Sequence, residues 1–245
     1  MTVVLKLGGS VVTEKDERET VADDRLADLA AAVGRAGLED LVVVHGAGSF
    51  GHPHAAEHGT SDTEGTEDAA AVREIARVME DLNRAVVDAL ADAGVPAVPV
   101  HPLSAGHRTE DGALRYPTSH VETMLEEGFV PVLHGDILAE AGEGATILSG
   151  DELVTHFGAA LDADRVGLCS TVPGVYDADG DVIPEITSFA DAADALGESD
   201  AADVTGGMAA KVRALLDLGS PAFVFGPGAI EEFLAGDDAG TRIDG

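Results

Sequence analysis

The sequence TVVLKLGGS, residues 2–10, combines two signals that together indicate an α/β protein. Residues 2–7 are a short run of apolar and β-branched residues, which is typical of a strand buried on both faces. The run ends directly in Gly8, Gly9 and Ser10. Glycines at this point predict a tight turn whose backbone can approach a phosphate group closely.

The same unit recurs along the chain, with strands and helices in alternation. Helical spacing of apolar residues predicts helices over 23–36, 68–93, 118–127 and 151–161, the last capped by Asp151, and another opened by residues 203–208 that runs to Leu218. Buried strands are predicted over 39–45, 95–100, 129–133, 165–169 and 222–225. Strands that alternate with helices predict an α/β three-layer sandwich, with a mainly parallel central sheet covered by helices on both faces. No repeat or linker divides residues 1–245, so we expect a single domain.

The composition excludes several classes of protein. The chain has 245 residues, 14 Lys+Arg against 46 Asp+Glu, and a formal net charge of -32. So acidic a surface repels nucleic acids and anionic membranes, and we expect neither as a partner. Because molar salt screens such self-repulsion, the charge is typical of a halophilic protein. Cys169 is the one cysteine, which excludes a disulfide scaffold, and the apolar run at the start is too short for a signal peptide or a membrane span, so we expect a cytoplasmic protein.

Lysine is almost absent from the chain. Lys6, Lys15 and Lys211 are the only three, beside eleven arginines, and all three lie near glycine-rich turns. An ammonium is a compact, mobile point charge that a planar guanidinium does not replace. The count therefore predicts that these lysines are retained for a site and not for the surface.

Five glycine-bearing turns mark the expected site, because ligands on parallel sheets bind beyond the carboxyl ends of the strands. They are KLGGS, HGAGSFGH, HGD, SGD and TGGM. Backbone N–H groups of such turns, with lysines beside them, favour a site for several phosphate groups. No Walker A, GxGxxG, GxSxG or zinc-type spacing is present, so we predict no metal site made of protein ligands alone. The glycines of residues 46–51 argue against a regular helix that carries metal ligands there.

These motifs carry a resemblance. KLGGS, the glycine-rich turn after the second strand, SGD and GGM followed by Lys211 resemble the amino acid kinase superfamily over nearly the whole chain. Within it, HGAGSFGHP, Lys15, VPVLHGDI, ILSGDE and DVTGGMAAK are similar to the isopentenyl phosphate kinase family. The resemblance implies transfer of the γ-phosphoryl group of ATP to isopentenyl phosphate, with Mg²⁺, by a homodimer. It also implies an acceptor-binding lobe over about 1–148 and a nucleotide-binding lobe over about 149–245.

The resemblance assigns roles to individual residues. Lys6 would bridge the transferring phosphoryl group, Lys15 would neutralise ATP or the transition state, and Lys211 would hold the γ-phosphate. Asp151 would orient the lysines, and His52 would donate a hydrogen bond to the acceptor phosphate. ATP would be bound by Lys6, Gly8, Gly9, Ser10, Gly48, Thr171, Gly174, Asp177, Gly206, Gly207 and Lys211. The acceptor would be bound by Gly46, Ala47, His52, Gly135 and Gly150, with Ile75, Met79 and Ile137 along its tail.

Other interpretations of these residues stay open from the sequence. Ile75, Met79 and Leu82 also fit a core face, Asp203 also fits a helix cap, and His45 and His134 fit histidines that stabilise turns. The alternative activities are a fosfomycin-type phosphonate kinase, another kinase of the superfamily, and a catalytically silent nucleotide-binding regulator. Retention of Lys6, Lys15, Asp151 and Lys211 together speaks against the last.

Overall fold

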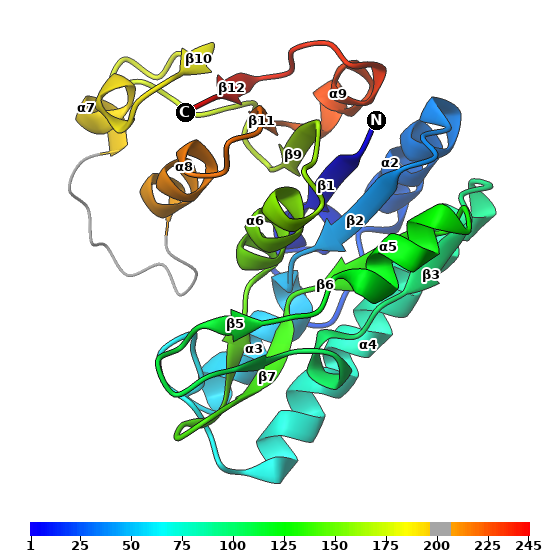
Figure 1. Ribbon diagram of the computed structural model, residues 1–245, viewed down its shortest axis with the longest axis vertical. Coiled ribbons are helices and arrows are strands. Elements are labelled where there is room, and N and C mark those ends of the chain that lie inside the picture. The colour runs from blue at the N-terminus through cyan, green and yellow to red at the C-terminus, as the bar shows by residue number, and fades with distance from the viewer. Residues whose placement is uncertain (197–206) are drawn as a thin grey trace.

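The computed structural model describes residues 1–196 and 207–245 (Figure 1). Among them, eight strands form one sheet in the order β10-β12-β11-β9-β1-β2-β6-β3. β1 (Val3–Leu7) lies between β2 (Leu41–His45) and β9 (Arg165–Cys169) and is parallel to both. The segment that opens the chain therefore becomes a central strand, and Lys6 lies beside Val44 and Leu168 in register.

The remaining strands extend this sheet on both sides. β6 (Val130–His134) and β3 (Ala97–Pro99) continue it in parallel beyond β2. β11 (Ala222–Phe225) is parallel to β9, whereas β12 (Thr241–Ile243) is antiparallel to β11 and carries the short β10 (Glu185–Ile186) at the edge. The sheet is thus mainly parallel, as predicted.

Helices cover both faces of the sheet. α2 (Asp23–Ala36), α4 (Ala69–Asp92) and α9 (Ile230–Ala235) share one core with Val3, Leu5 and Leu7. α5 (Ser119–Glu126), α6 (Gly150–Ala160) and α8 (Met208–Leu216) share the other with Val4. Successive side chains of a strand point to opposite faces, so one short apolar strand serves both cores. The predicted three-layer sandwich is confirmed.

A second, smaller sheet was not predicted. Its order is β5 (Leu114–Arg115), β4 (His107–Arg108), β7 (Asp136–Glu140), β8 (Gly144–Leu148), and it lies beside α3 and α4 in Figure 1. Short segments complete the chain: α1 (Gly9–Val12), α7 (Ala193–Leu196) and 3₁₀ turns at Pro102–Ser104, Phe189–Asp191 and Pro227–Ala229. None of the helices in the described part of the chain is long and apolar enough to span a membrane.

Two local predictions were wrong. Gly48–Glu57 forms the helix α3 although it contains Gly48, Gly51 and Pro53. Gly48 adopts a φ of 49°, and a Cβ on Gly9 would lie 2.2 Å from the Gly48 nitrogen, so these glycines serve a close backbone approach and do not break the helix. The N-cap of α6 is Ser149, whose Oγ accepts a hydrogen bond from the Glu152 N–H at 3.1 Å. Asp151 therefore lies inside the first turn, where its side chain is free for other partners.

Candidate active site

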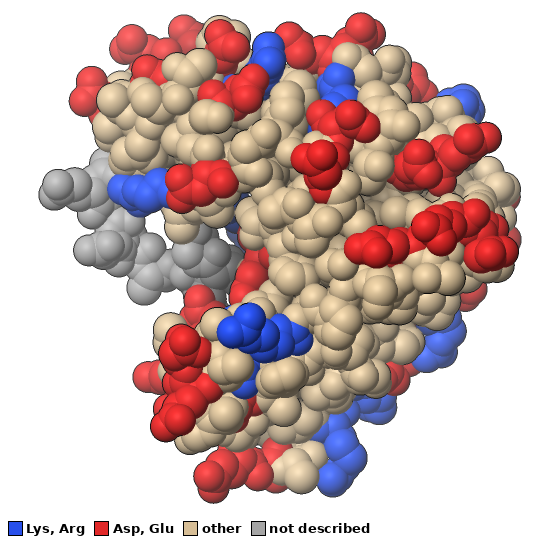
Figure 2. Space-filling model, viewed as in Figure 1, with Lys and Arg blue, Asp and Glu red and all other residues tan. Residues whose placement is uncertain are grey.

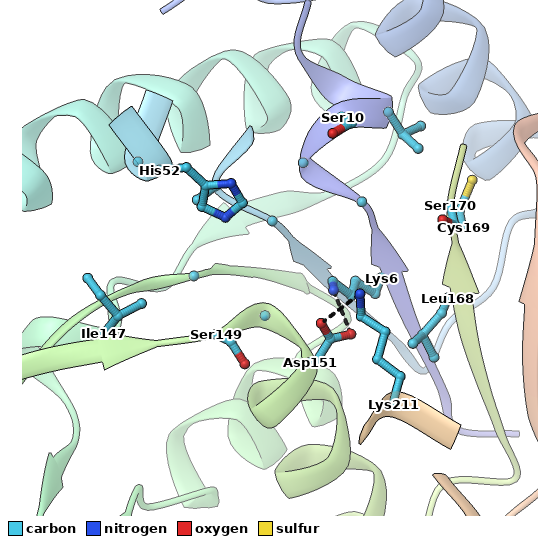
Figure 3. A pocket seen from close by; sticks show the side chains of 18 of the residues that line it. Lys6, Ser10, His52, Ile147, Ser149, Asp151, Leu168, Cys169, Ser170 and Lys211 are labelled. Atoms are coloured by element: carbon cyan, nitrogen blue, oxygen red, sulfur yellow. Dashed lines mark ion pairs between the residues drawn. The ribbon is translucent and has the colours of Figure 1, made fainter. Parts of the chain in front are cut away.

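A cavity of about 420 Å³ opens at the carboxyl ends of the central strands (Figure 3). Its walls come from β1, β9, the starts of α3 and α6, and the first turn of α8. The helices α3 and α6 begin at Gly48 and Gly150, so their first backbone N–H groups have no partner within the helix. Together with the partial positive charge of a helix N-terminus, such groups bind anions.

Two lysines and one carboxylate meet on one wall of this cavity. Lys6 Nζ lies 2.6 Å from Asp151 Oδ1, and Lys211 Nζ lies 3.7 Å from Asp151 Oδ2. Only 9% of Lys6 is exposed. Burial is the largest influence on its pKa and lowers it, while the charge of Asp151 acts in the opposite direction. Figure 3 shows the two ammonium groups next to each other, each joined to the Asp151 carboxylate by an ion pair, so one anion holds two cations close together.

Lys15 and His52 also line the cavity. Both are exposed side chains, Lys15 in the loop after α1 and His52 on α3. In Figure 3, His52 lies across the cavity from the Lys6–Asp151 pair. All three lysines of the chain therefore line one cavity. This agrees with the prediction that they are retained for a site and not for the surface.

The structure brings most of the acceptor candidates to this cavity. Gly46, Ala47, Gly135 and Gly150 line it with their backbone, and Ile75 and Met79 from α4 line it with their side chains. Ile137 does not line the cavity and packs in a small core with Ile75 and Ala55. Ile75 and Met79 also pack in that core and in the main one, so both interpretations of these residues fit the structure.

The nucleotide candidates are divided. Gly8, Gly9, Ser10 and Thr171 line the cavity. Three others serve local packing: Gly48 lies against Gly9, a Cβ on Gly174 would lie 2.5 Å from Val182, and Asp177 accepts hydrogen bonds from the backbone of Asp179 and Asp181 at 2.9 Å. Gly207 directly precedes α8 and does not line the cavity. Gly206 and Asp203 lie outside the described residues.

Sequence reasoning missed several lining residues. They are contributed by strand ends and neighbouring turns and include Asp136, Ile147, Leu168, Ser170, Met208 and Val224. Asp136 had a signal, the HGD turn, but that turn was interpreted only through its glycine. Its carboxylate accepts hydrogen bonds from the backbone of Ile137 at 2.9 Å and Leu103 at 3.1 Å, and burial raises its pKa to about 7.

Two histidines directly precede Gly46 and Gly135, the glycines that line the cavity after β2 and β6. His45 and His134 are fully buried on β2 and β6, with their rings stacked 5.6 Å apart. Each Nδ1 lies near the carbonyl of the next glycine, Gly46 or Gly135, at 3.1 Å and 2.9 Å. Burial lowers the pKa of His45 to about 4 and that of His134 well below its usual range, so both are neutral at pH 7. The prediction that they stabilise turns agrees with this geometry.

The carboxylates of the cavity leave little for a metal ion. In the described part of the chain, only Asp136 and Asp151 line it, and both are already engaged, Asp136 by two backbone N–H groups and Asp151 by two lysines. Mg²⁺ in phosphoryl-transfer sites is held largely by phosphate oxygens and water. The lining fits a nucleotide-borne Mg²⁺ better than a metal held by the protein.

Comparisons with known proteins agree with this architecture. A model described as the amino acid kinase family matches residues 1–220. An isopentenyl phosphate kinase of Haloferax volcanii is 65% identical over 244 residues, which cover 99% of this chain and 98% of that protein. One of Methanothermobacter thermautotrophicus is 38% identical over 264 residues, covering 99% of each.

Solved structures give the same result. An X-ray structure of isopentenyl phosphate kinase matches with a TM-score of 0.79 and 32% identity, covering 99% of this chain and 100% of that one. A substrate complex of the same enzyme type matches with a TM-score of 0.78 and 25% identity, covering 98% of each chain. Family model, sequence relatives and solved structures thus coincide over almost the entire length: the chain belongs to the isopentenyl phosphate kinases of the amino acid kinase family.

Proposed function

We propose that this chain transfers the γ-phosphoryl group of ATP to isopentenyl phosphate, giving isopentenyl diphosphate and ADP. The observation that carries the proposal is the meeting of all three lysines and His52 in a single cavity that also has an apolar part. Two anions that repel each other need cations between them, and a chain of charge -32 has to concentrate those cations locally. The retained lysines meet that need.

The chemistry requires positioning and charge stabilisation more than proton transfer. Phosphoryl transfer passes through a loose, in-line transition state whose charge is spread over the transferred oxygens. An acceptor phosphate with a second pKa near ~6 is already ionised at neutral pH, so no general base is needed. Lys6 and Lys211, held by Asp151, would stabilise the transferred group from one side, and Lys15 from the loop after α1.

The acceptor would lie between α3 and the apolar wall. His52 and the first N–H groups of α3 and α6 would bind its phosphate. Ile75, Met79 and Ile147 would contact its five-carbon tail. Ile137 would act only behind Ile75, because it packs against the same small core and does not line the cavity.

The nucleotide would occupy the side formed by β9 and α8. Gly8, Gly9, Ser10, Thr171 and Lys211 are the lining residues that would bind its phosphates. When bound, Mg²⁺ would supply a charge that neutralises phosphate oxygens. Thr171 and Lys211 belong to the proposed nucleotide lobe of about 149–245, whereas Gly8, Gly9 and Ser10 would reach the nucleotide from the proposed acceptor lobe of about 1–148. Lys6 and Asp151 are a contact between the two proposed lobes.

The proposal also includes a homodimer in the cytoplasm of a salt-accumulating cell. The charge of -32 and the 65% identity to a Haloferax volcanii protein support the salt-adapted setting. The dimer follows from the family resemblance, and light scattering of the purified chain in molar KCl tests it.

An acceptor panel tests the activity. ADP release with ATP is measured for isopentenyl phosphate, methyl phosphate, fosfomycin and acetylglutamate. Burying the tail at about 0.8 kcal/mol per CH₂ predicts that kcat/KM for methyl phosphate is lower by roughly two orders of magnitude. Equal values for the two phosphates, or a preference for fosfomycin, would contradict the proposal and favour the phosphonate alternative.

A further inference from the structure

A cluster of charged side chains lies beside α3, outside the cavity. Its centre is His54, of which the side chain is only 4% exposed. His54 Nε2 lies 2.8 Å from Glu19 Oε1, and His54 Nδ1 lies 2.8 Å from Glu74 Oε1. Glu19 belongs to the loop that carries Lys15, and Glu74 belongs to α4. One imidazole thus joins this loop to two helices.

Arg18 makes a second contact between the same loop and α3. Its Nη2 donates to Glu57 Oε2 at 2.8 Å and lies 3.1 Å from both ring nitrogens of His54. The hydrogen bond from Arg18 lowers the pKa of Glu57, and the hydrogen bonds from His58 and His54 lower that of Glu74. Arg18, His54 and His58 therefore share three carboxylates, those of Glu19, Glu57 and Glu74.

The backbone of the loop also contacts α3, at a carbonyl that Pro53 leaves without its helical hydrogen bond. Pro53 has no N–H, so the carbonyl of Ser49, four residues earlier, receives no helical hydrogen bond from it. The Glu19 N–H donates to that carbonyl at 3.0 Å. Glu19 reaches it with a φ of 51°, a left-handed conformation that non-glycine residues adopt only when their contacts fix it.

The loop is fixed at its base as well. Thr13 forms an antiparallel bridge with Val21, and Thr13 Oγ1 accepts a hydrogen bond from the Ser49 N–H at 3.0 Å. Lys15 lies between this base and the charged cluster, and His52 lies on α3 between Ser49 and His54. One set of contacts thus holds the two segments that carry Lys15 and His52, two exposed side chains of the cavity lining.

We propose that His54 is a positioning residue for phosphoryl transfer: by bridging Glu19 and Glu74 it fixes the Lys15 loop on α3 and so holds Lys15 opposite the acceptor phosphate. The inference rests on the proposed function. His54 touches no substrate and acts through the placement of Lys15.

A metal ion does not explain the cluster. Ligand atoms of His54, Glu57 and Glu74 do lie within 4.8 Å of one another. The guanidinium of Arg18 contacts two of these three side chains, however, and supplies the positive charge that an ion would bring. The cluster therefore already contains a cation, the Arg18 guanidinium, next to its carboxylates.

The test combines kinetics with hydrogen exchange. His54→Ala is compared with the wild type and with His58→Ala, a control on the same stretch of chain whose ring contacts Glu74 but not the loop. In molar KCl, kcat with ATP and isopentenyl phosphate is measured together with amide exchange of the peptide covering residues 13–21. Because displacement of a catalytic group by about 1 Å costs up to ~100-fold, we expect His54→Ala to lower kcat by about tenfold or more.

Exchange of residues 13–21 should rise about fivefold in His54→Ala while exchange of β1 and β2 stays unchanged, because only the docking of the loop is lost. His58→Ala should leave both readouts within about twofold of the wild type. Unchanged loop exchange, or unchanged kcat with a freed loop, would overturn the proposal, as would an equal rise of exchange over the whole sheet. Hydrogen exchange is measured without turnover. A wild type without kinase activity would therefore disprove the proposed function, whereas the exchange of residues 13–21 would still show whether His54 fixes the loop.

Discussion

Lys6 is the position at which burial and charge oppose each other most directly. Its ammonium is almost completely enclosed, yet transfer of a phosphoryl group needs it charged. Burial lowers its pKa, and the Asp151 carboxylate at 2.6 Å opposes that effect. Asp151 therefore acts by keeping Lys6 protonated as well as by placing it.

Replacing Asp151 should move the alkaline limit of activity. Asp151→Asn removes the charge that raises the pKa of Lys6, so that pKa falls further, and Lys6 loses its proton at a lower pH. Because only protonated Lys6 stabilises the transferred group, kcat should decline at a lower pH than in the wild type. The measurement is kcat between pH 6 and pH 10, with Glu152→Gln as the control, since Glu152 pairs with Arg108. An alkaline limb at the wild-type pH in Asp151→Asn would show that this carboxylate does not govern Lys6.

His52 should act on the acceptor and not on ATP. Loss of a hydrogen bond to a charged group costs about 1.5 to 3 kcal/mol, so His52→Ala should lower kcat/KM for isopentenyl phosphate by roughly 10- to 150-fold. The KM for ATP should stay near the wild-type value, because His52 lies across the cavity from Lys211 (Figure 3). His107→Ala, an exposed histidine on β4, is the control. A comparable increase in the KM for ATP would place His52 in the other half of the site.

The strands and helices show which parts of this molecule the sequence could predict. β9 and β11 have the predicted bounds, and α2 and α4 agree within one residue, because each is a regular element with one apolar pattern. α3 could not be predicted in that way. Its glycines and Pro53 weaken the local signal, and the helix is stabilised by tertiary contacts with Gly9 and the loop at Glu19.

Neither the smaller sheet nor the position of four nucleotide candidates away from the cavity lining could be predicted from the sequence, for a similar reason. β4 and β5 have two residues each, too few to show a period of two. Ser170 and Val224 reach the cavity only because β9 and β11 pair in parallel. Gly174 and Asp177 carry the right residue types in a turn that packs on itself, which sequence motifs do not distinguish from a binding turn.

The stacked histidines of β2 and β6 should make the fold sensitive to acid. His45 and His134 resist protonation when folded, with the pKa of His45 near 4, whereas in the unfolded chain they accept protons below about pH 6.5. Stability should therefore fall as the pH drops from about 6.5 towards 4, by at most ~1.4 kcal/mol per pH unit for each histidine. The check is Tm between pH 7.5 and pH 5 in molar KCl for the wild type and His45→Gln. Between pH 7.5 and pH 5 the Tm of His45→Gln should fall by fewer degrees than the Tm of the wild type, regardless of the value at pH 7.5. An equal fall of Tm in both proteins would contradict the assignment of the acid sensitivity to His45.

The charge of the whole molecule predicts its response to salt. Acidic side chains gather over the upper and right-hand parts of the face drawn in Figure 2, whereas basic ones lie in small separate groups at its centre and edges. The screening length falls from about 8 Å at 0.15 M salt to about 3 Å at 1 M, so Tm should rise as KCl is increased over this range. Sucrose at matched osmolality is the control, because a neutral osmolyte stabilises by exclusion and not by screening. A Tm that is unchanged or lowered by KCl would show that self-repulsion does not limit this fold.

Across 245 residues, the distribution of lysine is the feature that joins composition to chemistry. A chain that has almost eliminated this residue retains it at three positions, and all three line one cavity. If folding required these lysines, their replacement would lower Tm. If phosphoryl transfer requires them, replacement lowers turnover while the fold persists.

The decisive measurement is therefore kcat for Lys6→Met, Lys15→Met and Lys211→Met, and for the three Lys→Arg variants, beside thermal unfolding in the same molar KCl. Methionine keeps the apolar stem and removes the charge, and the exposed Arg84→Met is the control. Loss of one electrostatic donor commonly costs on the order of 10² to 10³ in kcat, and arginine cannot reproduce the position of the ammonium, so Lys6→Arg and Lys211→Arg should stay strongly impaired. We expect these losses with Tm close to the wild-type value. Near-normal kcat in any two of the methionine variants would contradict the assignment of this cavity to phosphoryl transfer.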